Sequence, residues 1–245
     1  MGLLTAHPFL LIIGSFPITA HGLFFGAAAV VAIVVFEWLA VRAQLPVDRL
    51  YERALLIFVS GLIAARIGFF IVYPSAFQSV GQVLAIWQGG LVSYIGMAVG
   101  VGVAYLLFHK EPKRLVWLDL LGLVSLLGWA IGRLGNYYAA DSVGVLMVNS
   151  PFYGRVPIQL MEAGWCLIAF FVLYDVYKKQ RLAPGDLLLW SFITYFAGRF
   201  VIDIWRDEGK WLGLHFSQWT SLGLLLVTVV IFYFIKNRRE HYASR

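Results

Sequence analysis

Hydrophobic residues are grouped along this chain in long runs that short polar stretches separate. Each run is close to the roughly 20 residues that an α-helix needs to cross the hydrocarbon core of a bilayer. Residues 1–19 contain Pro8 and Pro17 and are expected to lie at the membrane interface instead. Seven membrane-spanning helices are therefore predicted, at about residues 20–41, 54–73, 91–108, 115–136, 158–177, 185–205 and 213–235.

The composition supports this interpretation. Hydrophobic residues make up 61% of the 245 residues and charged residues 13%, which is about half the charge of an average soluble domain. The only cysteine, Cys166, has no partner for a disulfide, and the N-terminus lacks the basic stretch of a signal peptide. We predict an all-α integral membrane protein with a single domain over residues 1–245.

Lys and Arg residues are concentrated in alternate connections. Thirteen of the 19 follow the first, third, fifth and seventh runs, whereas the connection at 74–90 holds none. Because basic connections face the cytoplasm, the N-terminus is predicted outside and the C-terminus in the cytoplasm. The net charge of +6 then reflects membrane topology, and no nucleic-acid partner is expected.

Six basic residues do not follow this rule, since they fall in the outer halves of spans or in outer connections. They are Arg66, Arg133, Arg155, Arg199, Arg206 and Lys210. Charge at membrane depth costs about 2.5–3.5 kcal/mol or more, so it usually faces a protein interior and marks a functional site. Polar residues at the outer ends of other spans accompany them: His21, Tyr94, Gln159 and Glu162. The pattern predicts a polar, positively charged cavity that faces the outer leaflet.

The fourth run ends in Gly132-Arg133-Leu134-Gly135-Asn136, which Asp141 and Gly144 follow. This stretch resembles the signature of the prolipoprotein diacylglyceryl transferases, G-R-x-G-N-F-x-N-x-E-x-x-G. Further stretches resemble motifs of that family in the same order: Ala65-Arg66-Ile67-Gly68, Trp87-Gln88-Gly89-Gly90-Leu91, Pro157-Ile158-Gln159-Leu160-Met161-Glu162, Gly198-Arg199-Phe200 with Asp203 and Arg206, and Phe216-Ser217-Gln218. The resemblance covers nearly the whole chain.

The chain departs from the family pattern at several motif positions. Tyr94 stands where the family often has a histidine, and His21 where it usually has a tyrosine. Ala139 and Asp141 replace the signature asparagine and glutamate, and Asp203 replaces the glutamate that follows the arginine of the sixth span. Two alternatives stay open: a paralogue that binds phosphatidylglycerol or lipidates another acceptor, and a membrane transporter.

The resemblance implies a reaction in the bacterial inner membrane. The sequence contains no nucleotide-binding loop and its histidines are scattered, so no cofactor and no metal is expected. A diacylglyceryl group moves from phosphatidylglycerol to the lipobox cysteine in the signal peptide of a prolipoprotein. A thioether forms and glycerol phosphate is released, which is the first step of lipoprotein maturation. The implied partners are therefore phosphatidylglycerol, the prolipoprotein and the lipid bilayer.

This chemistry needs a cation at the departing phosphate. Arginine is suited to it because its planar guanidinium holds phosphate oxygens by bidentate, charge-assisted bonds. We expect Arg133 and Arg199 to hold the phosphate, with Asp203 about one helical turn from Arg199 and able to orient it. Asn136 and Asp141 are expected to orient Arg133 or a glycerol hydroxyl.

The proton of the acceptor thiol must also be removed. The pKa of a free cysteine thiol is about 8.5, so a field of nearby cations can generate thiolate without a strong base. Histidine is the better proton acceptor at neutral pH and tyrosine the poorer one. We expect His21 and Tyr94 together to replace the histidine–tyrosine pair of the family.

Four further residues complete the candidate substrate site. Arg66, Gln159, Glu162 and Arg206 are expected to bind substrate. A structural role for Arg66, Gln159 or Glu162 stays open, as does contact of Arg206 with lipid head groups.

Overall fold

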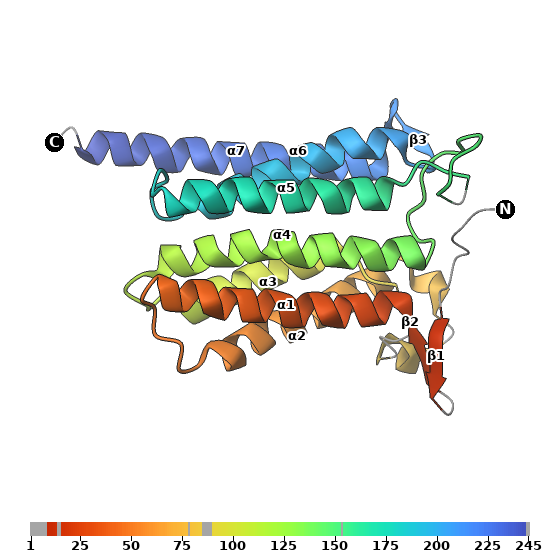
Figure 1. The fold of residues 1–245 in the computed structure, drawn as a ribbon, viewed down its shortest axis with the longest axis horizontal. Helices are drawn as coiled ribbons and strands as arrows, with labels where there is room; N and C mark the ends of the chain where they lie inside the picture. Colours follow the sequence, from red (N-terminus) through yellow and green to blue (C-terminus); the bar gives the residue numbers. More distant parts are fainter. Residues whose placement is uncertain (1–8, 14–15, 78, 85–89, 153, 244–245) are drawn as a thin grey trace. The chain divides into compact units, whose positions relative to one another are not determined.

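The computed structural model describes residues 9–13, 16–77, 79–84, 90–152 and 154–243. Figure 1 shows the chain as a set of long helices with short strands near their ends. The elements in chain order are β1 (Phe9–Ile13), β2 (Phe16–Thr19), α1 (Ala20–Arg42), α2 (Leu50–Val72), η1 (Pro74–Ala76), η2 (Val80–Leu84), α3 (Ser93–Phe108), α4 (Arg114–Tyr138), α5 (Ile158–Lys178), α6 (Asp186–Ile202), η4 (Asp203–Trp205), β3 (Lys210–Trp211), β4 (Leu214–His215) and α7 (Phe216–Ala243).

Each of the seven predicted runs is a helix. Within the described residues, six helices are long and apolar enough to cross a membrane. The exception is α3, whose 16 residues fall short of the roughly 20 that a span requires. The prediction of an all-α integral membrane protein is confirmed, with six such helices and one shorter apolar helix among the residues described.

The stretch before the first helix contains a feature that the sequence pattern did not predict. Strands β1 and β2 pair in an antiparallel hairpin, with Phe9 opposite Thr19. The connection between α2 and α3 contains the short 3₁₀ helices η1 and η2. Trp87, Gln88 and Gly89, which resemble a family motif, lie outside the described residues.

Packing divides the chain into two compact units. The larger unit consists of Met1–Val34 and Asp119–Arg245, and the smaller of Val35–Leu118. In the larger unit, α6 packs against both α5 and α7. In the smaller unit, α2 packs against α3, and the rings of Phe36, Phe108 and Trp117 are in mutual contact.

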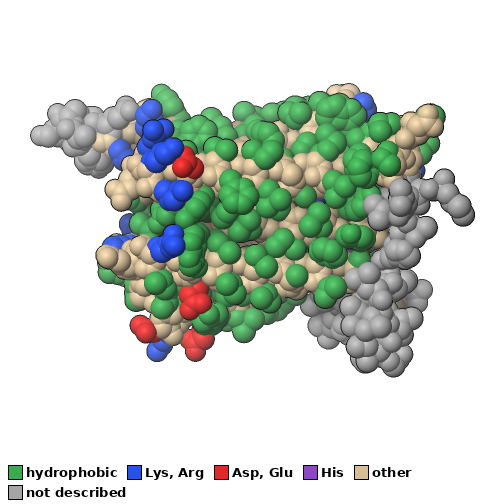
Figure 2. All heavy atoms as spheres, viewed as in Figure 1, with side chains coloured by type: hydrophobic (Ala, Val, Ile, Leu, Met, Phe, Trp, Pro, Cys, Tyr) green, Lys and Arg blue, Asp and Glu red, His purple; other side chains and the backbone are tan. Residues whose placement is uncertain are grey.

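The surface of the larger unit is that of a membrane protein. Figure 2 shows hydrophobic side chains along the sides of its helices and Lys and Arg side chains where α5 and α7 end. Exposed apolar residues on these two helices include Ile168, Phe171, Val172, Leu226, Val227 and Val230. Apolar side chains this numerous on exposed helix faces are stable only against lipid or another apolar partner.

Asp119 fixes the beginning of α6. Its carboxylate accepts hydrogen bonds from the backbone N–H groups of Gly185, at 2.7 Å, and Leu188, at 2.9 Å. These N–H groups have no partner within their own helix, and a negative charge is favourable at a helix N-terminus. Because Asp119 belongs to α4, this contact fixes α6 along α4 and with it the position of Arg199 at the other end of α6.

Candidate active site

Three helices of the larger unit bring charged side chains to one place. Arg133 lies in the last turns of α4, Glu162 in the second turn of α5, and Arg199 near the end of α6. Glu162 forms an ion pair with the Nε of Arg133, and its Oε1 lies 3.5 Å from Nη1 of Arg199. Glu162 and Arg199 are only 4% and 6% exposed, so one buried carboxylate joins two arginines.

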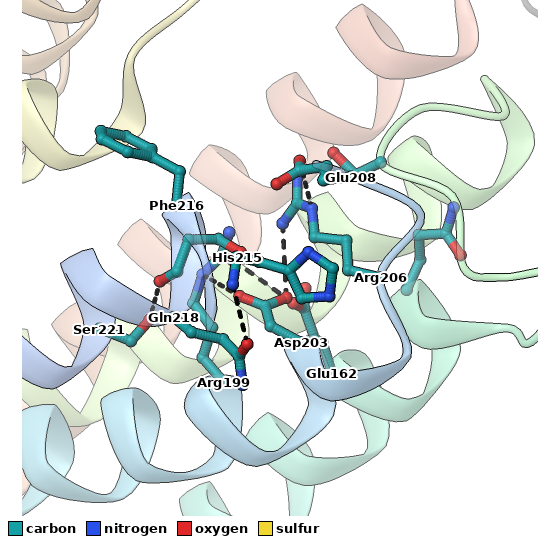
Figure 3. A network of polar contacts seen from close by, with 12 residues as sticks. Glu162, Arg199, Asp203, Arg206, Glu208, His215, Phe216, Gln218 and Ser221 are labelled. Carbon is teal, nitrogen blue, oxygen red and sulfur yellow. Dashed lines mark hydrogen bonds and ion pairs between the residues drawn. The ribbon is translucent and has the colours of Figure 1, made fainter. Parts of the chain in front are cut away.

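The network continues beyond Arg199 where α6 passes into η4. Oδ2 of Asp203 lies 3.5 Å from Nε of Arg199, and Oδ1 lies 3.4 Å from Nη1 of Arg206. Nε of Arg206 lies 2.5 Å from Oε1 of Glu208. Figure 3 shows these side chains as one connected network. The spacings of four and three residues on a helical backbone place Asp203 next to both arginines.

Cations and carboxylates alternate along this network, in the order Arg133, Glu162, Arg199, Asp203, Arg206 and Glu208. Burying an unpaired charge is very costly, whereas paired buried charges are tolerated. The alternation explains how this many charges can lie at the end of a helical membrane protein. It also places several guanidinium groups close together, where an incoming anion can bind them.

The other side of Arg133 contacts Asn136 and His21. In the amide orientation that satisfies both ends of Asn136, its oxygen accepts from Nη1 of Arg133 at 3.1 Å. Its nitrogen then donates to Nδ1 of His21 at 3.0 Å and to the carbonyl of Gly132 at 3.1 Å. Because Arg133 can only donate, it selects this orientation of the amide. The amide thereby connects His21 on α1 to the arginine network.

Two glycines allow the helices to approach each other closely at the site. A Cβ on Gly198 would lie 1.9 Å from the indole nitrogen of Trp165, one turn after Glu162. A Cβ on Gly135 would lie 2.7 Å from Cβ of Phe24, one turn after His21. The absence of a side chain at these positions lets α5 meet α6 and α1 meet α4 at the distances that the polar contacts need.

The loop between α4 and α5 is tied to the end of α6. Gly144 pairs with Arg206 in an isolated β-bridge, and the amide of Gln159 donates to the backbone oxygen of Asp141 at 2.7 Å. Arg155 contacts Asp207 at 2.5 Å. The carboxylate of Asp141 itself is on an exposed residue. Gln159 therefore anchors this loop, and the β-bridge of Gly144 joins it to Arg206 of the network.

Two predicted site residues belong to the smaller unit. Arg66 in α2 is buried, and its guanidinium donates to the backbone oxygens of Gln82, Val83 and Gly90 at 2.7, 3.0 and 3.1 Å. These bonds fix the connection between α2 and α3. Tyr94 is the second residue of α3 and is half-buried.

Two residues of the network and one residue beside it were not among the predicted site residues. The hydroxyl of Tyr195 lies 3.4 Å from Nη1 of Arg199, and the spacing of four residues on a helix could have suggested this contact. Glu208 follows Arg206 closely in the sequence and pairs with it. His215 lies beside the Phe216-Ser217-Gln218 stretch, but no periodicity in the sequence indicated that its ring is buried.

The described residues contain no group of three or more His, Cys, Asp or Glu side chains that could hold a metal ion. The polar groups that the structure does bring together are arginines, carboxylates, an amide and a histidine. Guanidinium groups bind phosphates and carboxylates. This donor set is therefore suited to an anionic substrate.

Membrane-length helices and a buried arginine–carboxylate network define the class: a multi-spanning membrane protein whose buried arginines are suited to an anionic group. The family model of prolipoprotein diacylglyceryl transferase matches residues 8–234. The chain belongs to this family, and the resemblance seen in the sequence motifs is confirmed.

Curated relatives extend the match over nearly the full chain. A protein of Streptococcus uberis is 26% identical over 93% of this chain and 94% of its own length. One of Streptococcus equi subsp. zooepidemicus is 28% identical over 91% of this chain and 93% of its own length. One of Trichormus variabilis is 30% identical over 88% of this chain and 84% of its own length. Each is named phosphatidylglycerol–prolipoprotein diacylglyceryl transferase.

Proposed function

We propose that this protein transfers a diacylglyceryl group from phosphatidylglycerol to the cysteine thiol of a prolipoprotein. The observation that carries the proposal is the convergence of Arg133 and Arg199 on Glu162. Membership of the family and the names of the relatives support the same reaction. The acceptor is the lipobox cysteine of the signal peptide, and the transfer is the first step of lipoprotein maturation.

The reaction creates negative charge at the phosphate. The sulfur of the acceptor attacks a glyceryl carbon and forms a C–S bond. The C–O bond to phosphate breaks, and its electron pair stays on the phosphate oxygen of the departing glycerol phosphate. A phosphodiester with one negative charge thus becomes a monoester that can carry two. Preorganised donors aimed at such developing charge are usually the largest single contribution to catalysis.

Arg133 and Arg199 supply these donors. Each guanidinium has several N–H groups in a rigid plane, so it can hold a neighbouring carboxylate and still reach a phosphate oxygen. Glu162 keeps the two groups at a set separation before substrate arrives. Asp203 also holds Arg199 in place, and Asn136 also holds Arg133. The phosphate then meets donors that need no rearrangement.

The thiol proton leaves with help from His21 and Tyr94. In the orientation that Arg133 selects, Asn136 donates to Nδ1 of His21, so a neutral His21 carries its own proton on Nε2. For His21 to accept a proton, the Asn136 amide must rotate or release the ring. Binding of phosphate at Arg133 competes with the bond that holds the amide, and this couples substrate binding to the release of His21 Nδ1. Tyr94, the second residue of α3, is the other residue that we propose for this proton transfer.

We place the site at the outer leaflet of the bacterial inner membrane. Most Lys and Arg residues follow the first, third, fifth and seventh apolar runs of the sequence, and the positive-inside rule assigns these positions to the cytoplasm. Arg133, Glu162 and Arg199 lie at the opposite ends of their helices. Residues 1–245 then act as a single domain embedded in the bilayer, and the acceptor signal peptide reaches the site from the membrane.

The test is a transfer assay with the purified protein in phosphatidylglycerol vesicles. A synthetic peptide with a lipobox cysteine is the acceptor, and mass spectrometry detects the gain of a diacylglyceryl group. We expect the adduct with the cysteine peptide and none with a Cys→Ser peptide or in phosphatidylethanolamine vesicles. Binding of phosphatidylglycerol without adduct would contradict the proposal and favour a lipid-binding paralogue.

A further inference from the structure

His215 is a buried side chain whose polar atoms have no protein partner. It is 1% exposed, and neither Nδ1 nor Nε2 makes a hydrogen bond to any residue that the structure describes. The hydroxyl of Ser217 is also buried without such a partner. Most buried polar side-chain atoms are hydrogen-bonded, and each exception needs an explanation.

The position of His215 at the beginning of α7 does not explain why its ring is buried without a partner. His215 directly precedes α7 and so occupies the N-cap position, where Ser, Thr, Asp or Asn normally bonds to the first N–H groups of the helix. Gln218, the third residue of α7, accepts from the backbone N–H of His215 at 3.1 Å, which is one half of a capping box. The imidazole does not supply the other half. Its presence at this position is therefore not explained by capping.

The backbone around His215 is fixed on both sides. His215 pairs with Lys210 in the β3–β4 hairpin, and the amide of Gln218 donates to the backbone oxygen of Phe200 at 3.1 Å. Phe200 follows Arg199 directly in α6. The ring is therefore preset relative to the arginine network, as a ligand-binding group must be to avoid an ordering cost.

The ring faces this network. Strand β4 packs against η4, and in Figure 3 the imidazole of His215 points toward Asp203 and Arg206. The charged side chains around it are Glu162, Arg199, Asp203, Arg206 and Glu208, each already in an ion pair. An anion that enters must share the N–H groups of these arginines with their carboxylates. The anion can accept a hydrogen bond from the ring N–H of His215 without breaking an ion pair.

We propose that His215 binds the phosphate ester of the lipid substrate by donating its ring N–H to a phosphate oxygen. This inference rests on the proposed function, because it places the phosphate at Arg199 and its neighbours. His215 is then a substrate-binding residue that adds to the arginines. A group that binds the phosphate equally in substrate and transition state raises KM when it is removed and leaves kcat nearly unchanged.

The test uses the full-length protein and two phosphate esters, phosphatidylglycerol in vesicles and soluble glycerol phosphate. His215→Phe keeps a ring but removes both nitrogens, and His215→Gln keeps one N–H donor. His109→Gln, at the end of α3, is the matched control. Two quantities are measured for each variant: KM for phosphatidylglycerol in the transfer assay, and Kd for glycerol phosphate from the thermal shift it produces.

For His215→Phe we expect both constants to rise about tenfold, the effect of losing one hydrogen bond to a charged group, with kcat nearly unchanged. Without ligand, this variant is expected to melt at the same temperature as the wild type or higher, because an unsatisfied polar group has been removed. A histidine with a merely structural role would lower the melting temperature. His215→Gln is expected to lie between the wild type and His215→Phe, and His109→Gln to match the wild type.

An unchanged Kd and KM in His215→Phe would overturn the inference. If that variant does not fold, His215→Leu, which also lacks a donor, takes its place, and unchanged constants there overturn the inference instead. A weaker Kd with an unchanged KM would show a site for soluble phosphate esters alone and would also overturn it. A wild-type protein that forms no thioether contradicts the proposed function, and the Kd measurements then still show whether His215 binds a phosphate ester.

Discussion

Glu162 is the residue on which the arrangement of the two arginines depends, so Glu162→Gln is the most informative substitution. Glutamine has nearly the same shape and removes only the charge. The change leaves Arg133 and Arg199, which are 13% and 6% exposed at their side chains, without their common carboxylate. Asp203 still pairs with Arg199, whereas the partner that Arg133 keeps among the described residues is the neutral Asn136.

The size of the effect follows from this burial. Removing one partner of a buried ion pair typically costs about 3–5 kcal/mol. For a chain of 150–250 residues, each kcal/mol lowers the melting temperature by roughly 2–4 °C. We therefore expect Glu162→Gln to melt about 6–20 °C below the wild type. The network also gains one net positive charge, so its affinity for glycerol phosphate is expected to rise while transfer falls.

The chain provides its own reporter for this experiment. Cys166 is the only cysteine and is 1% exposed, so a thiol-reactive dye labels the protein only as it unfolds. Glu208→Gln is the matched control, because Glu208 also pairs with an arginine but is 38% exposed at its side chain. Exposed ion pairs contribute about 0–1 kcal/mol, so this variant is expected to melt within a few degrees of the wild type.

A double variant separates the ion pair from other effects of the substitution. Adding Arg199→Met to Glu162→Gln removes a buried charge that has lost a partner, and we expect it to recover part of the lost stability. The reasoning would be refuted if Glu162→Gln were no less stable than Glu208→Gln, or if the two changes in the double variant were simply additive.

Three further predictions concern the surroundings of the network. Gly198→Ala places a Cβ against Trp165 and should cost about 1–3 kcal/mol by overpacking, with a lower melting temperature and slower transfer; an unchanged melting temperature would show that the helices can adjust. Asn136→Asp gives His21 an acceptor at Nδ1, so the proton of the neutral ring should move from Nε2 to Nδ1. Ring ¹⁵N chemical shifts detect this change, and the same tautomer in both proteins would refute the contact. Arg66→Lys cannot make the three carbonyl bonds that fix the connection to α3, so amide hydrogen exchange in that connection should become faster, and unchanged exchange would contradict the assigned role.

The helices could be predicted from the sequence because a single physical requirement determines them. A segment that crosses the hydrocarbon core must be apolar for about 20 residues, and this signal does not depend on tertiary contacts. The same reasoning does not decide the exact length of a helix, and α3 is shorter than a full span. The β1–β2 hairpin was not predicted, because proline-containing apolar stretches carry no clear strand pattern.

The site could be predicted only in part. Charge at membrane depth identified Arg133 and Arg199, and helical spacing placed Asp203 near Arg199, where it lies at 3.5 Å. The bridge through Glu162 joins residues from three helices. Such a contact depends on how the helices pack, and a single sequence does not contain that information. The burial of His215 has the same origin, since it follows from the packing of β4 against η4.

The central claim is that Arg133 and Arg199 hold the phosphate that leaves during transfer. It is tested most directly by the initial rate of diacylglyceryl transfer to a lipobox peptide, measured for Arg133→Ala, Arg199→Ala and the exposed control Arg181→Ala. We expect the first two to lose about 100-fold or more in kcat, while the control keeps the wild-type rate. Wild-type rates in either Arg133→Ala or Arg199→Ala would contradict it.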